Sequence, residues 1–197
     1  MENKEIGIYV HIPFCSQFCV YCNFYSVKGK DFRSKYVSAL KKEIESRKDF
    51  FKNTGVLPQT IYLGGGTPSL LSADELADIF GTICSTFRFT PVEATIEVNP
   101  NDVTLQFASG LRQAGFNRVS MGIQSFFDDH LVWMNRRHKG KEAVEAFNIL
   151  RRSGFTNISL DLIFGYQGLS NDQWRENISR MIALAPEHIS AYQMSIE

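Results

Sequence analysis

The stretch GIYVHIPFCSQFCVYC (residues 7–22) joins a β-rich run to three closely spaced cysteines. Its first part, GIYVHI (7–12), is rich in β-branched and aromatic residues, which is typical of a buried strand. Cys15, Cys19 and Cys22 follow within a short loop. In parallel α/β folds, ligands gather at the carboxyl ends of the strands. This stretch therefore predicts both the first strand and the position of a functional site.

The rest of the chain repeats the alternation of strand and helix. The β-rich runs lie at residues 7–12, 60–64, 94–98, 118–123, 158–164 and 188–196. Amphipathic, helical stretches lie between them at 32–51, 72–87, 104–115, 141–154 and 171–186. This order predicts an α/β fold with a parallel sheet and outer helices. A closed TIM barrel has eight strands and about 250 residues, so we expect a partial TIM barrel of the (β/α)6 type or an open sheet.

Charge and hydropathy narrow the class of protein. The 197 residues contain 21 Lys plus Arg and 21 Asp plus Glu, a balance that gives no indication of nucleic acid or an anionic membrane as a partner. No apolar run approaches the ~20 residues of a membrane span. The N-terminal sequence, residues 1–15, lacks the cleavage pattern of a signal peptide. We therefore expect a cytoplasmic protein without a transmembrane segment.

Three cysteines within eight residues favour metal binding in a reducing compartment. A [4Fe-4S] cluster normally takes four thiolates, and Phe24 occupies the next candidate position. Three ligands would leave one iron open for a substrate or cofactor. The alternatives are a zinc site, with His11 or a distant residue as fourth ligand, and a cysteine-rich turn that binds no metal. Cys84 lies in an apolar helical stretch and is expected to pack in the core.

Glycines follow the second strand in Leu63-Gly64-Gly65-Gly66-Thr67-Pro68. Such a run lets the backbone approach a ligand closely, and its amides could pair with the carboxylate or amino group of a small molecule; a flexible turn is the plainer interpretation. Ser72 and Glu75 predict a capping box at the next helix. Gly115 and Gly154 are expected to end helices.

Polar side chains stand where the later strands end, as expected for a common mouth. They are Glu97, Asn99, Gln124, Ser125 and Asp161. Arg136, beyond the fourth strand, could pair with a cofactor carboxylate through two hydrogen bonds. We expect the remaining cations of this segment to form a solvated face; they are Arg137, Lys139 and Lys141. We expect the other histidines to be surface or structural groups; they are His130, His138 and His188.

Together these motifs closely resemble the radical SAM (S-adenosylmethionine) family of oxygen-independent coproporphyrinogen III oxidases and their haem-chaperone (HemW-type) relatives. The resemblance runs in order along essentially the whole chain. Its motifs are YVHIPFC (9–15) with the cysteines after it, LGGGTPS (63–69), IEVNP (96–100), RVSMGIQSF (118–126), NRRH (135–138), LDLIFGYQG (160–168) and HISAYQMSIE (188–197).

The resemblance implies that Cys15, Cys19 and Cys22 bind a [4Fe-4S] cluster, and that SAM chelates the unique iron through its amino and carboxylate groups. In the oxidases, an electron then cleaves SAM to methionine and a 5′-deoxyadenosyl radical. The positions that match contacts of the cluster-bound SAM are Tyr9, Gly65 and Glu97. Those that match a second SAM site of the oxidases are Tyr21, Gly66, Thr67, Gln124, Arg136 and Asp161.

The chain departs from the family pattern at two positions, of which the first bears on the branch of the family and the second is expected to alter only a local turn. The oxidases carry a further cysteine where this chain has Phe24, and Gln167 replaces a usual proline. Phe24 and the ending AYQMSIE favour the haem-chaperone branch, which binds haem and delivers it to haem enzymes. The alternative is the oxidase, an oxidoreductase that decarboxylates two propionates of coproporphyrinogen III to vinyl groups. We expect residues 1–197 to be the radical SAM core, without the family's C-terminal domain.

Overall fold

A computed structural model describes residues 6–29, 32–52 and 55–194. Its centre is a six-stranded, wholly parallel sheet in which the strands lie in sequence order. The strands are β1 (Gly7–Ile12), β2 (Thr60–Gly65), β3 (Glu93–Val98), β4 (Arg118–Gln124), β5 (Ile158–Phe164) and β6 (His188–Gln193). The predicted strands are confirmed to within about one residue at their starts. Residues 195 and 196 of the last predicted run lie outside the described residues, as do residues 1–5 of the N-terminal interpretation.

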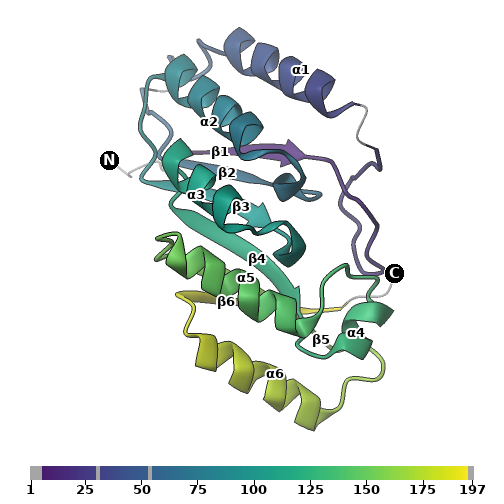
Figure 1. Ribbon diagram of the computed structural model, residues 1–197. Coiled ribbons are helices and arrows are strands. Elements are labelled where there is room, and N and C mark those ends of the chain that lie inside the picture. The colour runs from purple at the N-terminus through teal and green to yellow at the C-terminus, as the bar shows by residue number, and fades with distance from the viewer. Residues whose placement is uncertain (1–5, 30–31, 53–54, 195–197) are drawn as a thin grey trace.

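Helices follow the strands, and the first four of the longer helices pack on one another in turn (Figure 1). The longer ones are α1 (Arg33–Ser46), α2 (Ala73–Phe87), α3 (Leu105–Ala114), α5 (Gly140–Arg152) and α6 (Asn171–Leu184). Three short elements were not predicted: α4 (Asp128–Trp133) and the 3₁₀ turns η1 (Pro68–Leu70) and η2 (Pro100–Asp102). Each is too short to show a helical period in the sequence.

Local signals in the sequence fix several helix ends. Ser72 accepts a hydrogen bond from the Glu75 amide, and the Glu75 side chain accepts one from the Ser72 amide, which confirms the capping box. Gly115 ends α3 with a φ of 110°, a conformation that glycine adopts without a steric penalty. Gly154 differs slightly from expectation, because Ser153 caps α5 and Gly154 follows it with a φ of 89°.

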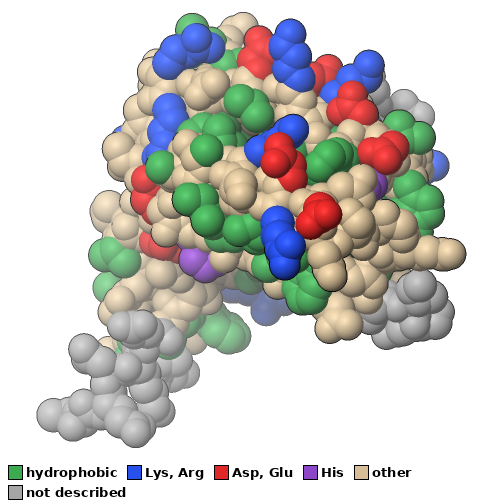
Figure 2. Space-filling model, turned by 90° about the horizontal axis from the view of Figure 1, so that it is seen from below, with side chains coloured by type: hydrophobic (Ala, Val, Ile, Leu, Met, Phe, Trp, Pro, Cys, Tyr) green, Lys and Arg blue, Asp and Glu red, His purple; other side chains and the backbone are tan. Residues whose placement is uncertain are grey.

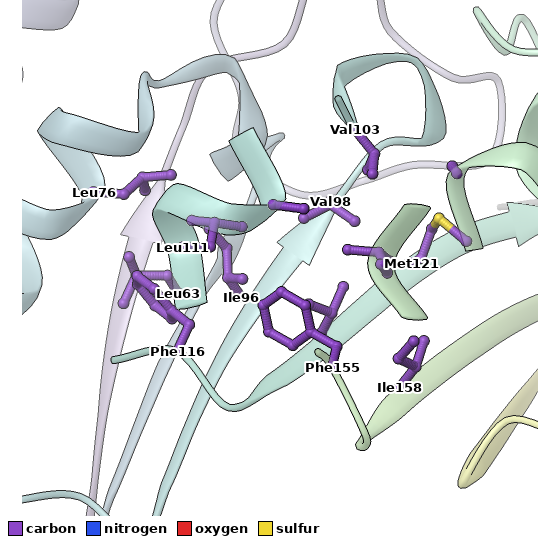
Figure 3. Packing of buried hydrophobic residues seen from close by; sticks show 14 of the residues in the cluster. Leu63, Leu76, Ile96, Val98, Val103, Leu111, Phe116, Met121, Phe155 and Ile158 are labelled. Carbon is purple, nitrogen blue, oxygen red and sulfur yellow. The ribbon is translucent and has the colours of Figure 1, made fainter. Parts of the chain in front are cut away.

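The main hydrophobic core lies between the sheet and its helices (Figure 3). Leu63 of β2, Ile96 of β3 and Met121 of β4 are fully buried. They belong to the same cluster as Leu111 of α3 and Phe155, which precedes β5. Burying each such side chain contributes about 1.5–3 kcal/mol. This packing makes the sheet a rigid base for the loops at its carboxyl edge.

The sheet does not close into a barrel. β1 and β6 are its two edges, and most residues of β6 are exposed. The expectation of a partial, (β/α)6-type barrel is therefore confirmed. No helix of the described residues has the length and apolarity required to cross a membrane. On the face shown in Figure 2, acidic and basic side chains are interspersed.

Candidate functional site

A cavity of about 380 Å³ lies at the carboxyl ends of the strands. Its volume is in the usual range for small-molecule sites. Ser125, also expected at the mouth, is instead fully buried and donates to Asn177 Oδ1 at 3.4 Å. All the residues predicted to bind the cluster or SAM, except Tyr9, line the cavity. These are Cys15, Cys19, Tyr21, Cys22, Gly65, Gly66, Thr67, Glu97, Gln124, Arg136 and Asp161. Segments far apart in the sequence thus converge on one space.

The loop after β1 brings the three cysteine thiols to this cavity. Its base is closed by a hydrogen bond from the Cys15 amide to the Val27 carbonyl, 3.0 Å. The Cys22 amide donates to the Cys19 carbonyl at 3.3 Å, which turns the backbone between those two residues. None of the three thiols is in a disulfide. Burial raises the pKa of the Cys22 thiol.

The zinc alternative requires a fourth ligand close to the three cysteines. No group of three or more His, Cys, Asp or Glu side chains among the described residues could hold a metal ion as they stand. Zinc requires its ligands within about 2.3 Å of a single ion, whereas the thiolates of a cluster bind different irons. The His11 ring, the suggested fourth ligand, already contacts the Tyr9 hydroxyl at 3.1 Å and the Tyr25 carbonyl at 2.9 Å.

The glycine run is packed tightly against its neighbours. A Cβ at Gly66 would lie 2.7 Å from the Phe14 carbonyl oxygen, and one at Gly65 would lie 2.5 Å from the His11 ring. Gly65 also has a φ of 111°. The expectation that these amides are free for a ligand is wrong for two of them. Gly65 N donates to Glu97 Oε2 at 3.1 Å, and Gly66 N donates to the Ile12 carbonyl at 2.8 Å.

Glu97 is held at the end of β3 by two donors. Besides Gly65 N, the Tyr62 hydroxyl donates to Glu97 Oε1 at 2.7 Å. Burial raises the pKa of the Glu97 carboxyl despite these hydrogen bonds. The sequence reasoning missed Tyr62, although its alternation in β2 places it beside Tyr9, its register partner in β1. Tyr9 itself is 57% exposed and stacks on Tyr62.

Arg136 points toward the cysteine loop from the segment after α4. Its Nη1 donates to the Tyr21 hydroxyl at 3.3 Å and to Cys19 Sγ at 3.6 Å, while its Nη2 donates to the Gly122 carbonyl at 2.8 Å. Burial raises the pKa of Tyr21. The guanidinium therefore connects the cysteine loop to β4.

Three buried polar atoms at this cavity have no hydrogen-bond partner among the described residues: Gln124 Oε1, Arg136 Nε and Asp161 Oδ1. A buried polar group without a partner costs about 1–3 kcal/mol. Gln124 also adopts a φ of 67° at an irregularity between β4 and β5, a conformation that is unfavourable for a residue with a Cβ. Unsatisfied polar atoms and strain of this kind concentrate at functional sites.

A match to a protein-family model identifies the family of this chain. The model described as "Radical SAM superfamily" matches residues 9–181. The chain belongs to the radical SAM superfamily. That range includes the three cysteines, the glycine run and every strand except the start of β1 and the whole of β6.

Individual radical SAM relatives resemble the chain over nearly its full length. It is 35% identical to "Heme chaperone HemW" of Haemophilus influenzae over 199 residues, and 36% identical to that of Bacillus subtilis over 194 residues. These matches cover 98% and 96% of the chain but 51% and 50% of the relatives. The chain thus spans about half the length of these relatives.

A solved structure of a radical SAM enzyme superposes on nearly the whole of this chain. Coproporphyrinogen III oxidase (HemN) from Escherichia coli, described as a radical SAM enzyme, superposes with a TM-score of 0.87 at 29% identity. The match covers 97% of this chain and 44% of that one. Methylornithine synthase, at 10% identity and a TM-score of 0.69, shares the fold.

Radical SAM membership implies a [4Fe-4S] cluster and SAM, and the residues at the cavity fit both. Three free thiols supply the soft ligands that iron–sulfur clusters require. The unpartnered atoms of Gln124, Arg136 and Asp161 suit a ligand with both donors and acceptors.

Asp161 gives a pH-dependent prediction. Burial, and secondly the charge of Glu97, raise its pKa from 3.8 to about 6. A carboxyl whose folded pKa exceeds its unfolded value destabilises the fold at neutral pH, and this cost disappears as the pH falls below the unfolded pKa. We expect Asp161→Asn to raise the free energy of unfolding by about 2–3 kcal/mol at pH 7.5 and by less than about 1 kcal/mol at pH 4.

Urea denaturation of the cluster-free chain at both pH values measures this difference. Asp172→Asn is the matched control, because the Asp172 side chain is 92% exposed at the start of α6. A gain for Asp161→Asn that is the same at both pH values would show that the Asp161 carboxyl is not the source.

One expectation about the charged residues outside the cysteine loop is wrong. Arg137 was expected on a solvated face but forms a partly buried ion pair with Asp102 at 2.7 Å, which fixes η2 beside the cavity. His130 and His138 are buried and hydrogen-bonded, and His188 contacts Ser159 at the sheet edge. These histidines have the structural or surface roles expected of them. Cys84 packs against the core while partly buried.

Proposed function

We propose that Cys15, Cys19 and Cys22 hold a [4Fe-4S] cluster with one open iron, and that residues 1–197 form a radical SAM core. The observation that supports this most is the convergence of the three thiols on one cavity with Glu97, the glycine run and Arg136. Three thiolates leave one iron of the cluster without a protein ligand. Cytoplasmic location stays a prediction from the sequence.

We further propose that SAM binds at the open iron, where the cluster would supply the electron for its reductive cleavage. Glu97 is suited to accept hydrogen bonds from the amino group of SAM, with Gly65 and Tyr9 beside it. A second SAM would use the unpartnered atoms of Gln124, Arg136 and Asp161. The residues assigned to that second subsite are Tyr21, Gly66, Thr67, Gln124, Arg136 and Asp161.

Among radical SAM functions, we propose a haem chaperone that binds haem and delivers it to haem-accepting enzymes. Relatives bearing that name cover 96–98% of this chain at 35–36% identity. Phe24, 69% exposed beside the cavity, stands where the oxidases carry a further cysteine. An apolar ring there cannot ligate iron, and it suits contact with a flat apolar ligand.

The second candidate is oxygen-independent coproporphyrinogen III oxidation, because the solved oxidase superposes with a TM-score of 0.87. In that case the ligand is a porphyrinogen and the protein is an oxidoreductase of porphyrin biosynthesis. The two candidates share the cluster and SAM. They differ in the further ligand, which is haem for the chaperone and a porphyrinogen for the oxidase.

Two assays on the anaerobically reconstituted protein separate the candidates. We expect haem titration to shift the Soret band and saturate near one haem per chain, and coproporphyrinogen III with SAM and a reductant to yield no vinyl product. Product formation without a Soret shift would contradict the chaperone and support the oxidase. If neither occurs while the cluster is present, haem handling requires residues beyond these 197.

A further inference from the structure

The tip of the cysteine loop is attached to one short turn that lies more than a hundred residues away. Asn135 Nδ2 donates to the Phe18 carbonyl at 2.6 Å, and Gln17 Nε2 donates to the Asn135 carbonyl at 2.6 Å. One residue earlier, the Met134 carbonyl accepts from the Val20 amide at 3.3 Å. These hydrogen bonds involve loop residues on both sides of Cys19.

The turn that makes these contacts has a fixed shape. Asn135 follows α4 and adopts a left-handed φ of 56°, which asparagine tolerates better than most residues. Its amide donates to the Val132 carbonyl at 3.0 Å, and the next amide, of Arg136, donates to the Leu131 carbonyl at 2.8 Å. The backbone therefore presents the Asn135 carbonyl and side chain to the cysteine loop while the Arg136 side chain reaches Cys19.

Apolar packing does little to hold the loop tip. Phe18 is 45% exposed and Val20 is 61% exposed, so neither side chain buries enough surface to fix the backbone between the cysteines. The base of the loop is closed at Cys15 and Val27, which leaves Cys19 and Cys22 dependent on contacts at the tip. The hydrogen bonds to Asn135 supply such contacts, in addition to those that Arg136 makes with Cys19 and Tyr21.

We propose that Asn135 is a positioning residue that, with Gln17, holds the cysteine loop in the shape that binds the cluster. This inference rests on the proposed cluster at Cys15, Cys19 and Cys22. Asn135 acts through its hydrogen bonds with Phe18 and Gln17, and its carbonyl also accepts a weak contact from the Cys19 thiol at 4.0 Å. Its role is to keep the three thiols correctly placed before iron binds and to slow the loss of iron afterwards.

The test measures how fast a chelator removes iron from the anaerobically reconstituted chain, followed by the loss of cluster absorbance. Asn135→Gly keeps the left-handed backbone and removes the side-chain donor, whereas Gln17→Ala removes the reciprocal bond from the loop. Outer-shell groups typically change metal affinity 10- to 100-fold. We expect each variant to lose iron about tenfold faster, at the lower end of that range because these hydrogen bonds are exposed to solvent.

Asn117→Ala is the matched control. Asn117 also makes two hydrogen bonds to backbone, donating to the Val92 carbonyl at 2.9 Å and accepting from the Ala94 amide at 2.8 Å. It lies at the amino ends of β3 and β4, whereas the cysteine loop lies at the carboxyl ends of the strands. We expect Asn117→Ala to lower the melting temperature of the cluster-free chain and to leave the rate of iron loss within about twofold.

The outcomes separate the inference from the proposed function. If the unaltered chain takes up no cluster, the proposed function fails. If the unaltered chain loads but Asn135→Gly and Gln17→Ala lose iron at its rate, the positioning role is wrong. The role is also overturned if iron loss in all three variants simply follows the fall in melting temperature, because Asn135 would then act only on general stability.

Discussion

Cys19→Ser is expected to reduce iron and sulfide from about four of each per reconstituted chain to near zero. A serine hydroxyl stays protonated at neutral pH, and its hard oxygen is a poor ligand for an iron–sulfur cluster. Cys19 lies between the other two cysteines in the loop and accepts from Arg136 Nη1 at 3.6 Å. Chemical assays of iron and acid-labile sulfide after anaerobic reconstitution measure the effect.

Cys84→Ser is the control for this substitution. Cys84 lies on α2 and packs against the core rather than at the cavity, so we expect this variant to load iron and sulfide like the unaltered chain. Full loading of Cys19→Ser, or loss of loading in Cys84→Ser alone, would contradict the assignment of the loop cysteines.

Glu97→Gln is expected to weaken SAM binding about 10- to 100-fold, which corresponds to about 1.5–3 kcal/mol for a hydrogen bond to a charged group. The neutral amide loses the charge that would attract an ammonium group. Its NH2 group would also face a donor, because Tyr62 O–H and Gly65 N–H both point at the Glu97 carboxylate. Calorimetric titration of the reconstituted protein with SAM, without reductant, gives the dissociation constant.

Glu93→Gln tests whether the effect belongs to position 97. Glu93 begins the same strand, at the end away from the cavity, and its side chain is 42% exposed. We expect its dissociation constant for SAM to stay within about twofold of the unaltered chain. Equal affinity in Glu97→Gln and the unaltered chain would remove Glu97 from the proposed SAM contacts.

The features of the fold that the sequence predicted well are those governed by local patterns. Strands such as β5 (Ile158–Phe164) are apolar runs buried on both faces of the sheet, and their limits are marked by turns and capped helices. The capping box at Ser72 depends on residues three apart. In contrast, α4 has only six residues, which is too short for a periodic pattern in the sequence to predict it. It also comes shortly after Gln124, whose backbone is strained.

The candidate site could be predicted as a set of residues but not as a set of contacts. Parallel strand order was enough to expect Glu97, Gln124 and Asp161 at one mouth, and the cavity contains all three. The bonds from Asn135 to the cysteine loop join residues 117 and 118 positions apart, and no local pattern reveals them. The glycine amides were misjudged for the same reason, since their acceptors Glu97 and Ile12 come from neighbouring strands.

The most direct test of the central claim is the electron paramagnetic resonance spectrum of the reconstituted, dithionite-reduced protein, recorded with and without SAM. If the three thiols leave one iron open to SAM, the reduced protein gives the spectrum of a [4Fe-4S]⁺ cluster, and SAM changes its g values. A reduced cluster whose spectrum is identical with and without saturating SAM would contradict the open iron. A colourless protein that retains zinc would contradict the cluster itself.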